Sequence, residues 1–206
     1  MGELALRAAQ RGAHVDTITL SSEQLALTRD KVRAGGVADR VDARLLDYRE
    51  VSGRYDAVVS VEMIEAVGLD FLDTYFATIR RVLRPGGRAA IQAITMPHHR
   101  LDLTRGGYTW IHKYIFPGGS LASRELLLAE AGRAGLRTVD TFRMGGSYAL
   151  TLRQWRESFD RQRDALSQLG FDHTFQRMWR FYLGYSEGGF RSGYLDVHQL
   201  TFEAVA

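Results

Sequence analysis

Residues 56–95, DAVVSVEMIEAVGLDFLDTYFATIRRVLRPGGRAAIQAIT, decide the fold. Apolar strands are predicted over Asp56–Val61 and Arg88–Thr95, and both have the composition of strands buried on both faces. Between them, residues 69–83 place their apolar side chains on one helical stripe. This helix is expected to end at the Arg-Pro-Gly-Gly turn of residues 84–87, because proline cannot continue a helix and glycine accepts a left-handed cap. Strand, amphipathic helix and strand in this order predict a parallel βαβ unit.

The same alternation extends in both directions from this unit. Further helices are predicted at residues 3–11, 22–34, 123–134, about 151–169 and 173–190, and further strands at His14–Leu20, Asp42–Leu46, Arg137–Phe142 and Val197–Ala204. We therefore predict an α/β fold, with a mostly parallel, Rossmann-like sheet covered by helices on both faces. The length suits one domain over residues 1–206, with a helical insertion at about 151–192.

The composition excludes several classes of protein. With 45% hydrophobic and 25% charged residues, the chain is an ordinary globular sequence. It contains no cysteine, which excludes a disulfide framework, a thiolate zinc site and a cysteine nucleophile. We find neither a signal peptide nor an apolar run of the length of a membrane span, so a cytoplasmic location is expected.

The charge balance is basic, and it has two explanations. The formal net charge is +3, and all but two of the 27 basic residues are arginine. This balance permits peripheral contact with an anionic membrane surface, for instance the inner membrane face, or with an acidic substrate. A solvated arginine-rich surface without a partner is the favoured alternative, because no run of like charge stands out. We expect no nucleic-acid partner.

Open α/β sheets bind ligands at the carboxyl ends of their strands, so the turns after the strands hold the candidate site. Thr19, Ser21 and Gln24 follow the first predicted strand, and their polar side chains are suited to a ribose. The alternative is structural, because Ser21 and Gln24 have the capping-box spacing of the following helix. After the second strand come Asp47 and Tyr48, a carboxylate and a ring suited to adenine; a solvated turn is the alternative.

Two acids, Glu62 and Glu65, follow the strand at 56–61 in an otherwise apolar stretch. Buried acids are rare unless they are paired or functional, so we expect a site role for at least one of them. His98 and His99 have no metal-ligand partner at a useful spacing, and no metal site is expected; the loop over Pro97–Arg105 should be exposed. The aromatic turn at Tyr114–Gly119 either lines an apolar cleft or packs under the sheet.

Taken together, these motifs resemble the cyclopropane-fatty-acyl-phospholipid synthases, a family of class I methyltransferases that use S-adenosylmethionine (SAM). The resemblance runs from residue 2 to about 203, and the motif beginning at Tyr114 is its most specific part. It is carried by Thr19-Leu20-Ser21 with Gln24, Asp47-Tyr48-Arg49, Glu65-Ala66-Val67-Gly68, Pro85-Gly86-Gly87, Tyr114 through Gly119, Tyr148 with Thr151-Leu152, Trp155, Met178 through Leu183, and Gly189-Phe190-Arg191.

The resemblance implies the reaction and the partners. A methyl group passes from SAM to a cis double bond of a phospholipid or fatty-acyl chain, and loss of a proton from the resulting carbocation closes a cyclopropane ring. Related enzymes leave a methyl branch or a methylene instead. The resemblance also implies an antiparallel C-terminal strand and a bound bicarbonate that acts as the base.

Roles for single residues follow from the same resemblance. Glu65 would hold the bicarbonate, with the Ile94 backbone, the Tyr148 hydroxyl and Gln92 as further contacts; several family members have histidine in place of Gln92. The SAM-binding residues would be Gly2, Thr19, Ser21, Gln24, Asp47, Tyr48 and Glu62.

Gly2 resembles the last glycine of the family's glycine-rich SAM loop, so the preceding central strand would lie upstream of Met1. We therefore expect this chain alone to bind SAM weakly, and the strands at 14–20 and 56–61 to have unpaired edges. Two other hypotheses remain open at this point: methylation of a small polar metabolite, and a catalytically inactive fragment that only binds a partner. The oligomeric state is left open.

Overall fold

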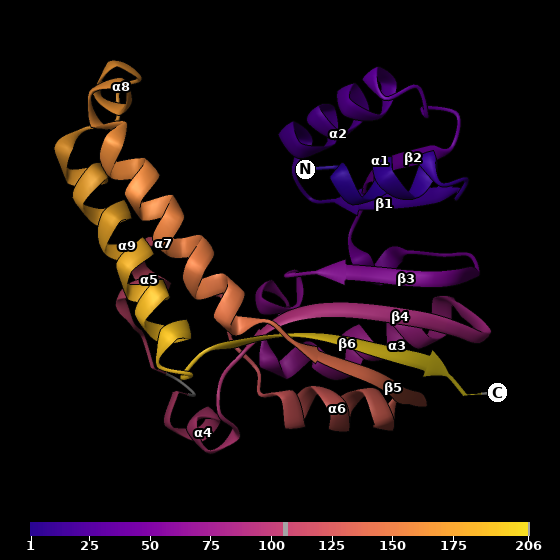
Figure 1. The fold of residues 1–206 in the computed structure, drawn as a ribbon. Helices are drawn as coiled ribbons and strands as arrows, with labels where there is room; N and C mark the ends of the chain where they lie inside the picture. Colours follow the sequence, from indigo (N-terminus) through magenta and orange to yellow (C-terminus); the bar gives the residue numbers. More distant parts are fainter. Residues whose placement is uncertain (105–106, 206) are drawn as a thin grey trace. The chain divides into compact units, whose positions relative to one another are not determined.

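The computed structural model describes residues 1–104 and 107–205. It divides into two compact units, Met1–Gly53 and Arg54–Ala206, and each is described here by itself (Figure 1). The prediction of one domain over residues 1–206 stays a prediction.

Unit 1 is a two-stranded parallel sheet with two helices. It consists of α1 (Glu3–Gln10), β1 (Val15–Thr19), α2 (Ser22–Ala34), β2 (Val41–Leu45) and the 3-10 turn η1 (Tyr48–Glu50). Thr19 in β1 pairs with Leu45 in β2, so the carboxyl ends of both strands lie at the same edge. A small core of Ala9, Val32 and Val37 joins α1 and α2. Within the described residues, β1 pairs with β2 alone, so its other edge is unpaired, as predicted.

Unit 2 contains a four-stranded sheet in the order β3-β4-β6-β5. Its elements are β3 (Tyr55–Val61), η2 (Ile64–Ala66), η3 (Leu69–Phe71), α3 (Leu72–Val82), β4 (Leu83–Thr95), η4 (His98–Arg100), α4 (Leu101–Thr104), α5 (Trp110–Tyr114), α6 (Arg124–Arg133), β5 (Leu136–Arg143), α7 (Gly145–Arg161), α8 (Arg163–Gln168), α9 (His173–Arg191) and β6 (Asp196–Ala204). β3 and β4 are parallel, whereas β6 runs antiparallel to β4 and to β5. The predicted antiparallel C-terminal strand is confirmed, and it lies between the two preceding strands.

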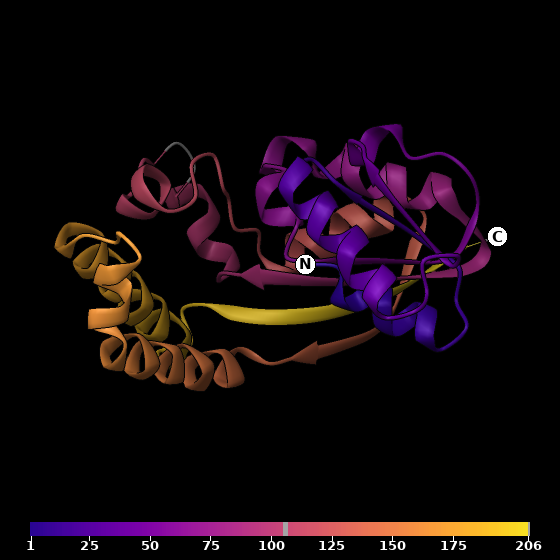
Figure 2. The ribbon, with the colours of Figure 1, turned by 90° about the horizontal axis from the view of Figure 1, so that it is seen from above.

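One face of this sheet is covered by α3 and α6 (Figure 2). The apolar stripe of α3 is buried as predicted, and Phe76 packs edge-on against Phe202 of β6, with ring centroids 6.0 Å apart. Ile91 in β4 and Leu127 in α6 are buried in the same layer. Burial of side chains of this size stabilises the fold by about 1.5–3 kcal/mol each.

The opposite face is more open, and this corrects one prediction. Val59 and Val61 of β3 are 50% and 52% exposed, so β3 is not buried on both faces. The physical reason is that α3 and α6 cover only one face of the sheet; β3 is also an edge strand, which among the described residues pairs with β4 alone. Side chains alternate along a strand, so Gln92 of β4 lies on the same open face as its pairing partner Val61.

The Arg-Pro-Gly-Gly segment lies within the bounds of β4 but forms a bulge there, because Leu83 and Arg88 pair with β3 and residues 84–87 between them do not. α3 ends at Val82, and β4 begins at Leu83, so residues 84–87 belong to the strand. Gly86 has φ +73°, the left-handed conformation expected of it, and the pairing register shifts between Tyr55 and Ala57 on the neighbouring strand. The segment predicted as a loop over Pro97–Arg105 is partly helical, in η4 and α4, with His98 and His99 exposed as predicted; Arg105 lies outside the described residues.

The predicted helical insertion is a hairpin of α7 and α9, and α7 begins at Gly145 rather than near 151. The hairpin lies beyond the carboxyl ends of β4 and β5 (Figures 1 and 2). The helix is interrupted at Gln162, between α7 and α8, so the single apolar stripe predicted over 151–169 does not form. Leu152 is buried against α9, whereas Trp155 and Leu169 are 59% and 74% exposed.

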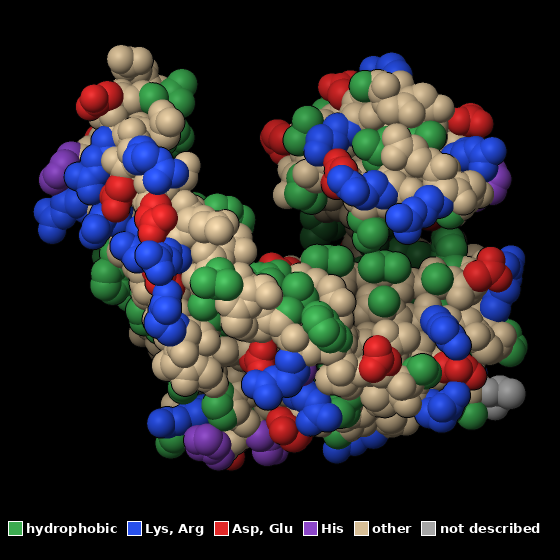
Figure 3. All heavy atoms as spheres, in the orientation of Figure 1, with side chains coloured by type: hydrophobic (Ala, Val, Ile, Leu, Met, Phe, Trp, Pro, Cys, Tyr) green, Lys and Arg blue, Asp and Glu red, His purple; other side chains and the backbone are tan. Residues whose placement is uncertain are grey.

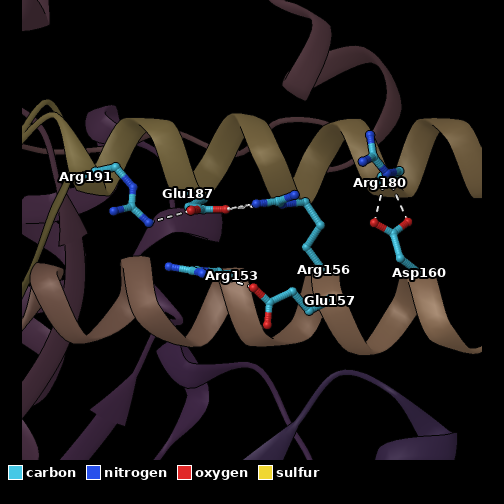
Figure 4. Close-up of polar contacts among 7 residues, drawn as sticks. All are labelled: Arg153, Arg156, Glu157, Asp160, Arg180, Glu187 and Arg191. Atoms are coloured by element: carbon cyan, nitrogen blue, oxygen red, sulfur yellow. Dashed lines mark hydrogen bonds and ion pairs between the residues drawn. The ribbon is translucent and has the colours of Figure 1, made fainter.

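Ion pairs join the two helices of the hairpin (Figure 4). Glu187 of α9 accepts hydrogen bonds from Arg156 of α7 at 2.8 Å and from Arg191 at 2.6 Å. Asp160 of α7 accepts from Arg180 of α9 at 3.0 Å. Charge-assisted bonds of this kind fix the helices in register. No helix among residues 1–104 and 107–205 is long and apolar enough to cross a membrane.

Candidate active site

Three groups that the sequence analysis selected meet at the carboxyl ends of β3 and β4. The carboxylate Oε1 of Glu62 accepts hydrogen bonds from the Tyr148 hydroxyl and, at 2.9 Å, from the Gln92 side-chain amide. The Gln92 amide also donates to the Tyr148 oxygen at 2.7 Å. Tyr148 and Gln92 were expected at the reaction centre, and Glu62 on the SAM side. The structure joins all three in one hydrogen-bonded cluster.

Glu62 occupies a strained position at the end of β3. Its φ is +50°, and among the described residues other than glycine it is alone in having positive φ. Such a conformation costs of the order of 1 kcal/mol for a side-chain-bearing residue and is concentrated at functional sites. The Glu62 N–H donates to the Gln92 carbonyl at 2.9 Å, which anchors the turn to β4.

Tyr148 lies in the first turn of α7, which is tied to the start of β6. The Met144 N–H donates to the Val197 carbonyl, and the Gly145 N–H donates to Asp196 Oδ1 at 3.0 Å. A Cβ at Gly145 would lie 2.6 Å from that oxygen, so this position requires glycine. The tight contact fixes the helix start and so places the Tyr148 ring over the sheet.

Glu65 is the second acid of the site, and it is mostly buried. Its Oε1 accepts the Ile94 N–H at 2.6 Å, so the two predicted residues do lie together. Its other oxygen, Oε2, is buried without a hydrogen-bond partner among the described residues. Burial raises the pKa of the Glu65 carboxyl above its usual value, partly offset by the Ile94 hydrogen bond, and the Glu62 charge raises it further. A carboxyl oxygen in this state is available to a ligand.

An aromatic wall adjoins these polar groups, from α5, the turn after it, α7 and α9. The Tyr148 ring lies 5.3 Å from Phe190, and Phe116 lies edge-on to Tyr182 at 5.9 Å. Trp110 of α5 lies edge-on to Phe181 of α9 at 4.7 Å. Phe116 is 53% exposed and faces α9, so the turn at Tyr114–Gly119 does not pack under the sheet.

Burial and the neighbouring acid raise the pKa of two phenols, Tyr148 and Tyr182. Burial raises the pKa of Tyr148, and the hydrogen bond to Glu62 raises it further. Burial likewise raises the pKa of Tyr182, and the Glu62 charge contributes. Tyr148 is therefore a neutral hydrogen-bond donor at physiological pH.

In unit 1, the residues predicted at the ends of β1 and β2 have partners within that unit. The Thr19 hydroxyl donates to Gln24 Oε1 at 2.8 Å. Ser21 caps α2 by accepting the Gln24 N–H at 3.2 Å, so the structural interpretation of Ser21 is confirmed. The reciprocal bond of a capping box is replaced, because the Ser21 N–H donates to Thr19 instead.

Asp47 is bound to its neighbour Arg49, with a Nη2 to Oδ2 distance of 2.7 Å. The Arg49 hydrogen bonds lower the pKa of Asp47 to about 2, so it is a carboxylate at all physiological pH values. Tyr48 begins the 3-10 turn, and the Arg49 guanidinium lies 5.9 Å from its ring centroid. Gly2 precedes α1 with φ +75°, and a Cβ there would lie 2.9 Å from the Thr28 side chain. Gly2 is thus required by the backbone, as a glycine of a tight loop would be.

Sequence reasoning missed two residues of this region. Gln199 of β6 pairs with Gln92 across the sheet and donates from Nε2 to Gln92 Oε1 at 2.9 Å. Asp196 holds the start of α7, as described above. Pairing of the last strand with the strand at 88–95 would have indicated both, since it places positions 196–199 opposite 92–95. Within the described ranges, the His, Asp and Glu side chains form no group that could hold a metal ion.

Comparison with known proteins shows the class of this fold and the family of this chain. A mycolic acid cyclopropane synthase whose crystal structure is a complex with SAH and CTAB superposes with a TM-score of 0.87 over 98% of this chain and 74% of that one, at 23% identity. The fold is therefore that of the class I methyltransferases, with a C-terminal antiparallel strand. The sequence model of the mycolic acid cyclopropane synthetase family matches residues 1–200, and the chain belongs to that family.

Two relatives extend the comparison. The chain is 57% identical over 201 residues to a tuberculostearic acid methyltransferase of Mycobacterium tuberculosis, covering 97% of this chain and 47% of that protein. It is 38% identical over 203 residues to a probable fatty acid methyltransferase of Pseudomonas putida, covering 97% of this chain and 51% of that protein. The chain thus spans about half the length of these relatives.

Proposed function

We propose that this protein is a SAM-dependent C-methyltransferase that acts on the cis double bond of a lipid acyl chain. The observation that carries the proposal is the cluster of Glu62, Gln92 and Tyr148 beside the half-buried acid Glu65, set against an aromatic wall. The names of the relatives, which include lipid methyltransferases and cyclopropane synthases, support the same substrate class. Both kinds of product begin with the same methyl transfer, so the proposal covers a ring, a branch or a methylene.

The chemistry requires stabilisation of positive charge in a dry place. When bound, SAM supplies an electrophilic methyl group from its sulfonium. The alkene π electrons form the new carbon–carbon bond as the carbon–sulfur bond breaks, and the positive charge passes to the neighbouring carbon of the acyl chain. The carboxylate of Glu62 and the rings of Tyr148 and Tyr182 favour that charge, and the apolar wall excludes water that would trap it.

Polar groups of unit 1 fit the cofactor's nucleoside end. Thr19 and Gln24 lie at the carboxyl end of β1, and Asp47 lies at the same edge after β2. We propose that the first two contact the ribose, while Asp47 and Tyr48 contact the adenine. Asp47 would then share its carboxylate between Arg49 and the ligand.

The residues also fit a bicarbonate ion. The buried, unpartnered Oε2 of Glu65 would accept a hydrogen bond from the hydroxyl of the bicarbonate. The Tyr148 hydroxyl would contact another oxygen of the same ion. The Ile94 N–H already donates to Glu65, so Ile94 would act through that carboxyl rather than on the ion. When bound, bicarbonate supplies a base for the proton that ring closure releases.

Access to an acyl chain requires contact with a lipid surface, and we propose the α7–α9 hairpin for this contact, at the inner membrane face. Lys and Arg side chains gather over the hairpin in Figure 3. Leu169 and Phe171, between α8 and α9, are 74% and 40% exposed. Basic side chains around exposed apolar ones suit an anionic bilayer.

The experiment is a methyl-transfer assay with radiolabelled SAM at millimolar concentration, because we expect the chain to bind SAM weakly. Two acceptors are offered together: vesicles of cis-unsaturated anionic phospholipid, and a water-soluble extract of small metabolites. The proposal predicts label in the lipid fraction, and none when the vesicles are fully saturated. Label in the water-soluble fraction alone would favour a metabolite methyltransferase. Absence of transfer to either would contradict the proposed activity and favour an inactive chain.

A further inference from the structure

We propose that Gln199 is a positioning residue for the reaction, which orients the Gln92 amide and through it Tyr148 and Glu62. The inference rests on the proposed function for its consequence in catalysis, and on hydrogen-bond geometry for its structural part. Gln199 does not touch the Glu62 carboxylate or the Tyr148 hydroxyl in any bond of the described residues; it acts through Gln92.

The Gln92 side chain has two unlike ends. A carboxamide has an acceptor oxygen and a donor nitrogen of nearly the same size, so it can be turned over without a change of shape. With Nε2 toward the site, Gln92 donates to Glu62 at 2.9 Å and to the Tyr148 oxygen at 2.7 Å. Turned over, it would set its oxygen against the Glu62 carboxylate, and both bonds would be lost.

Gln199 favours the first orientation from the other end, because with Gln92 turned over the bond between the two residues would be kept only if Gln199 turned over as well. Its Nε2 donates to Gln92 Oε1 at 2.9 Å. The two residues are direct partners in the antiparallel pairing of β4 and β6, so their side chains lie side by side on the open face of the sheet. The hydrogen bonds therefore all run in one direction, from the Gln199 donor to Gln92 and from the Gln92 donor to Glu62.

This orientation of Gln92 matters because it decides the direction in which the Tyr148 hydroxyl donates. The Tyr148 oxygen accepts from Gln92, so its own hydrogen points to Glu62. The phenol is thereby fixed in rotation, with its ring against Phe190 of the aromatic wall. Correct placement of such a group contributes to rate when the nucleophile is as weak as an alkene.

Three variants test the proposal. Gln199→Glu is nearly isosteric but presents only acceptors, so it attracts the Gln92 nitrogen away from the site. Gln199→Leu removes the bond without a competing one. Thr201→Val, two residues along on the same face of β6, is the matched control. Unfolding curves followed by tryptophan fluorescence check that all three fold.

The first readout is independent of activity: the side-chain amide resonances of Gln92 in protein labelled with ¹⁵N-glutamine, assigned with a Gln92→Leu variant. We expect these resonances to move in both Gln199 variants and to stay in place in Thr201→Val. The second readout is methyl transfer, where we expect kcat to fall about tenfold in both Gln199 variants, with KM for SAM changed less than twofold.

Unmoved Gln92 resonances would overturn the proposal, and so would moved resonances with an unchanged kcat. If the unsubstituted protein transfers no methyl group, the proposed function fails, and the resonances alone decide whether Gln199 orients Gln92.

Discussion

Replacing Glu65 by glutamine separates the chemical role of this acid from its structural role. The substitution keeps an oxygen to accept the Ile94 N–H, which lies 2.6 Å from Glu65 Oε1. It replaces the buried, unpartnered Oε2 by a neutral NH₂ group. The shape of the site is preserved, and its negative charge is lost.

Most substitutions destabilise a protein, whereas Glu65→Gln should stabilise this one. An ionised oxygen buried without a partner costs about 1–3 kcal/mol, and a neutral amide in the same place costs less. We therefore expect Glu65→Gln to be more stable than the wild type by about 1 kcal/mol at neutral pH.

The sign of the pH dependence follows from the raised pKa of Glu65 in the folded state. The unfolded carboxyl ionises near 4.5, and the folded one ionises at higher pH, so the folded state binds more protons in this window. The stability of the wild type relative to the variant should fall as the pH rises from 4.5 through the folded-state pKa. Below pH 4.5, ionisation of Glu65 should no longer contribute to the difference in stability between the two proteins.

Activity should move in the opposite direction. Glu65→Gln removes the acceptor proposed for the bicarbonate hydroxyl together with a negative charge of the site, and loss of one such group from an active site costs about 10²–10³ in kcat. The expected variant is therefore more stable and less active.

Urea unfolding followed by tryptophan fluorescence provides the assay, since Trp110, Trp155 and Trp179 all lie in unit 2 and report on it alone. Glu157→Gln, an exposed acid paired with Arg153 on α7, is the control and should change neither quantity much. The reasoning is refuted if Glu65→Gln is less stable than wild type at pH 7.5, or if it transfers methyl groups at the wild-type rate.

Three further substitutions have expected outcomes. Tyr148→Phe removes the hydroxyl that donates to Glu62, so initial rates should fall by about 10–100-fold and urea stability by about 1 kcal/mol. Gly145→Ala places a Cβ 2.6 Å from Asp196 Oδ1, and calorimetry should show a loss of about 1–3 kcal/mol with a lower rate, because the start of α7 must shift. Glu187→Gln weakens the ion pairs of the α7–α9 hairpin and should lower the free energy of unfolding in urea by about 1 kcal/mol. This difference from the wild type should shrink in high salt. A stable Gly145 variant, or a salt-independent effect at Glu187, would count against these readings.

Local features of this fold could be predicted from the sequence because their causes are local. The stripe of apolar residues over 72–82 requires a helix whose one side is buried, and α3 has that form. Ser21 has the side chain and position of a helix cap, and it caps α2. The strand-end acids Glu62 and Glu65 were selected because acids in apolar stretches are unusual, and Glu62 contacts Gln92 while Glu65 contacts Ile94 in the candidate site.

Features that depend on distant partners could not be predicted from local patterns. The valines of β3 are typical of a strand buried on both faces, yet Val59 and Val61 are half exposed, since burial depends on what packs against the sheet. Gly86 and its neighbours have the composition of a turn, and they form a bulge inside β4 between Leu83 and Arg88, the residues that pair with β3 on either side of it.

The contacts of the site are also long-range. Tyr148 and Glu62 are 86 residues apart, and Gln199 and Gln92 are 107 apart, so only the pairing of the sheet brings them together. The resemblance supplied Tyr148, whereas Gln199 carried no signal of its own in the sequence.

In the proposed function, a carboxylate and tyrosine cluster in unit 2 directs methyl transfer to a cis alkene. The most direct measurement is mass spectrometry of vesicles that contain cis-unsaturated, trans-unsaturated and saturated phospholipids together, after incubation with SAM carrying a deuterated methyl group. The account predicts deuterium in the cis-unsaturated lipid only, and its loss with Glu65→Gln. Deuterium spread equally over the cis and trans lipids, or retained in full by Glu65→Gln, would contradict it.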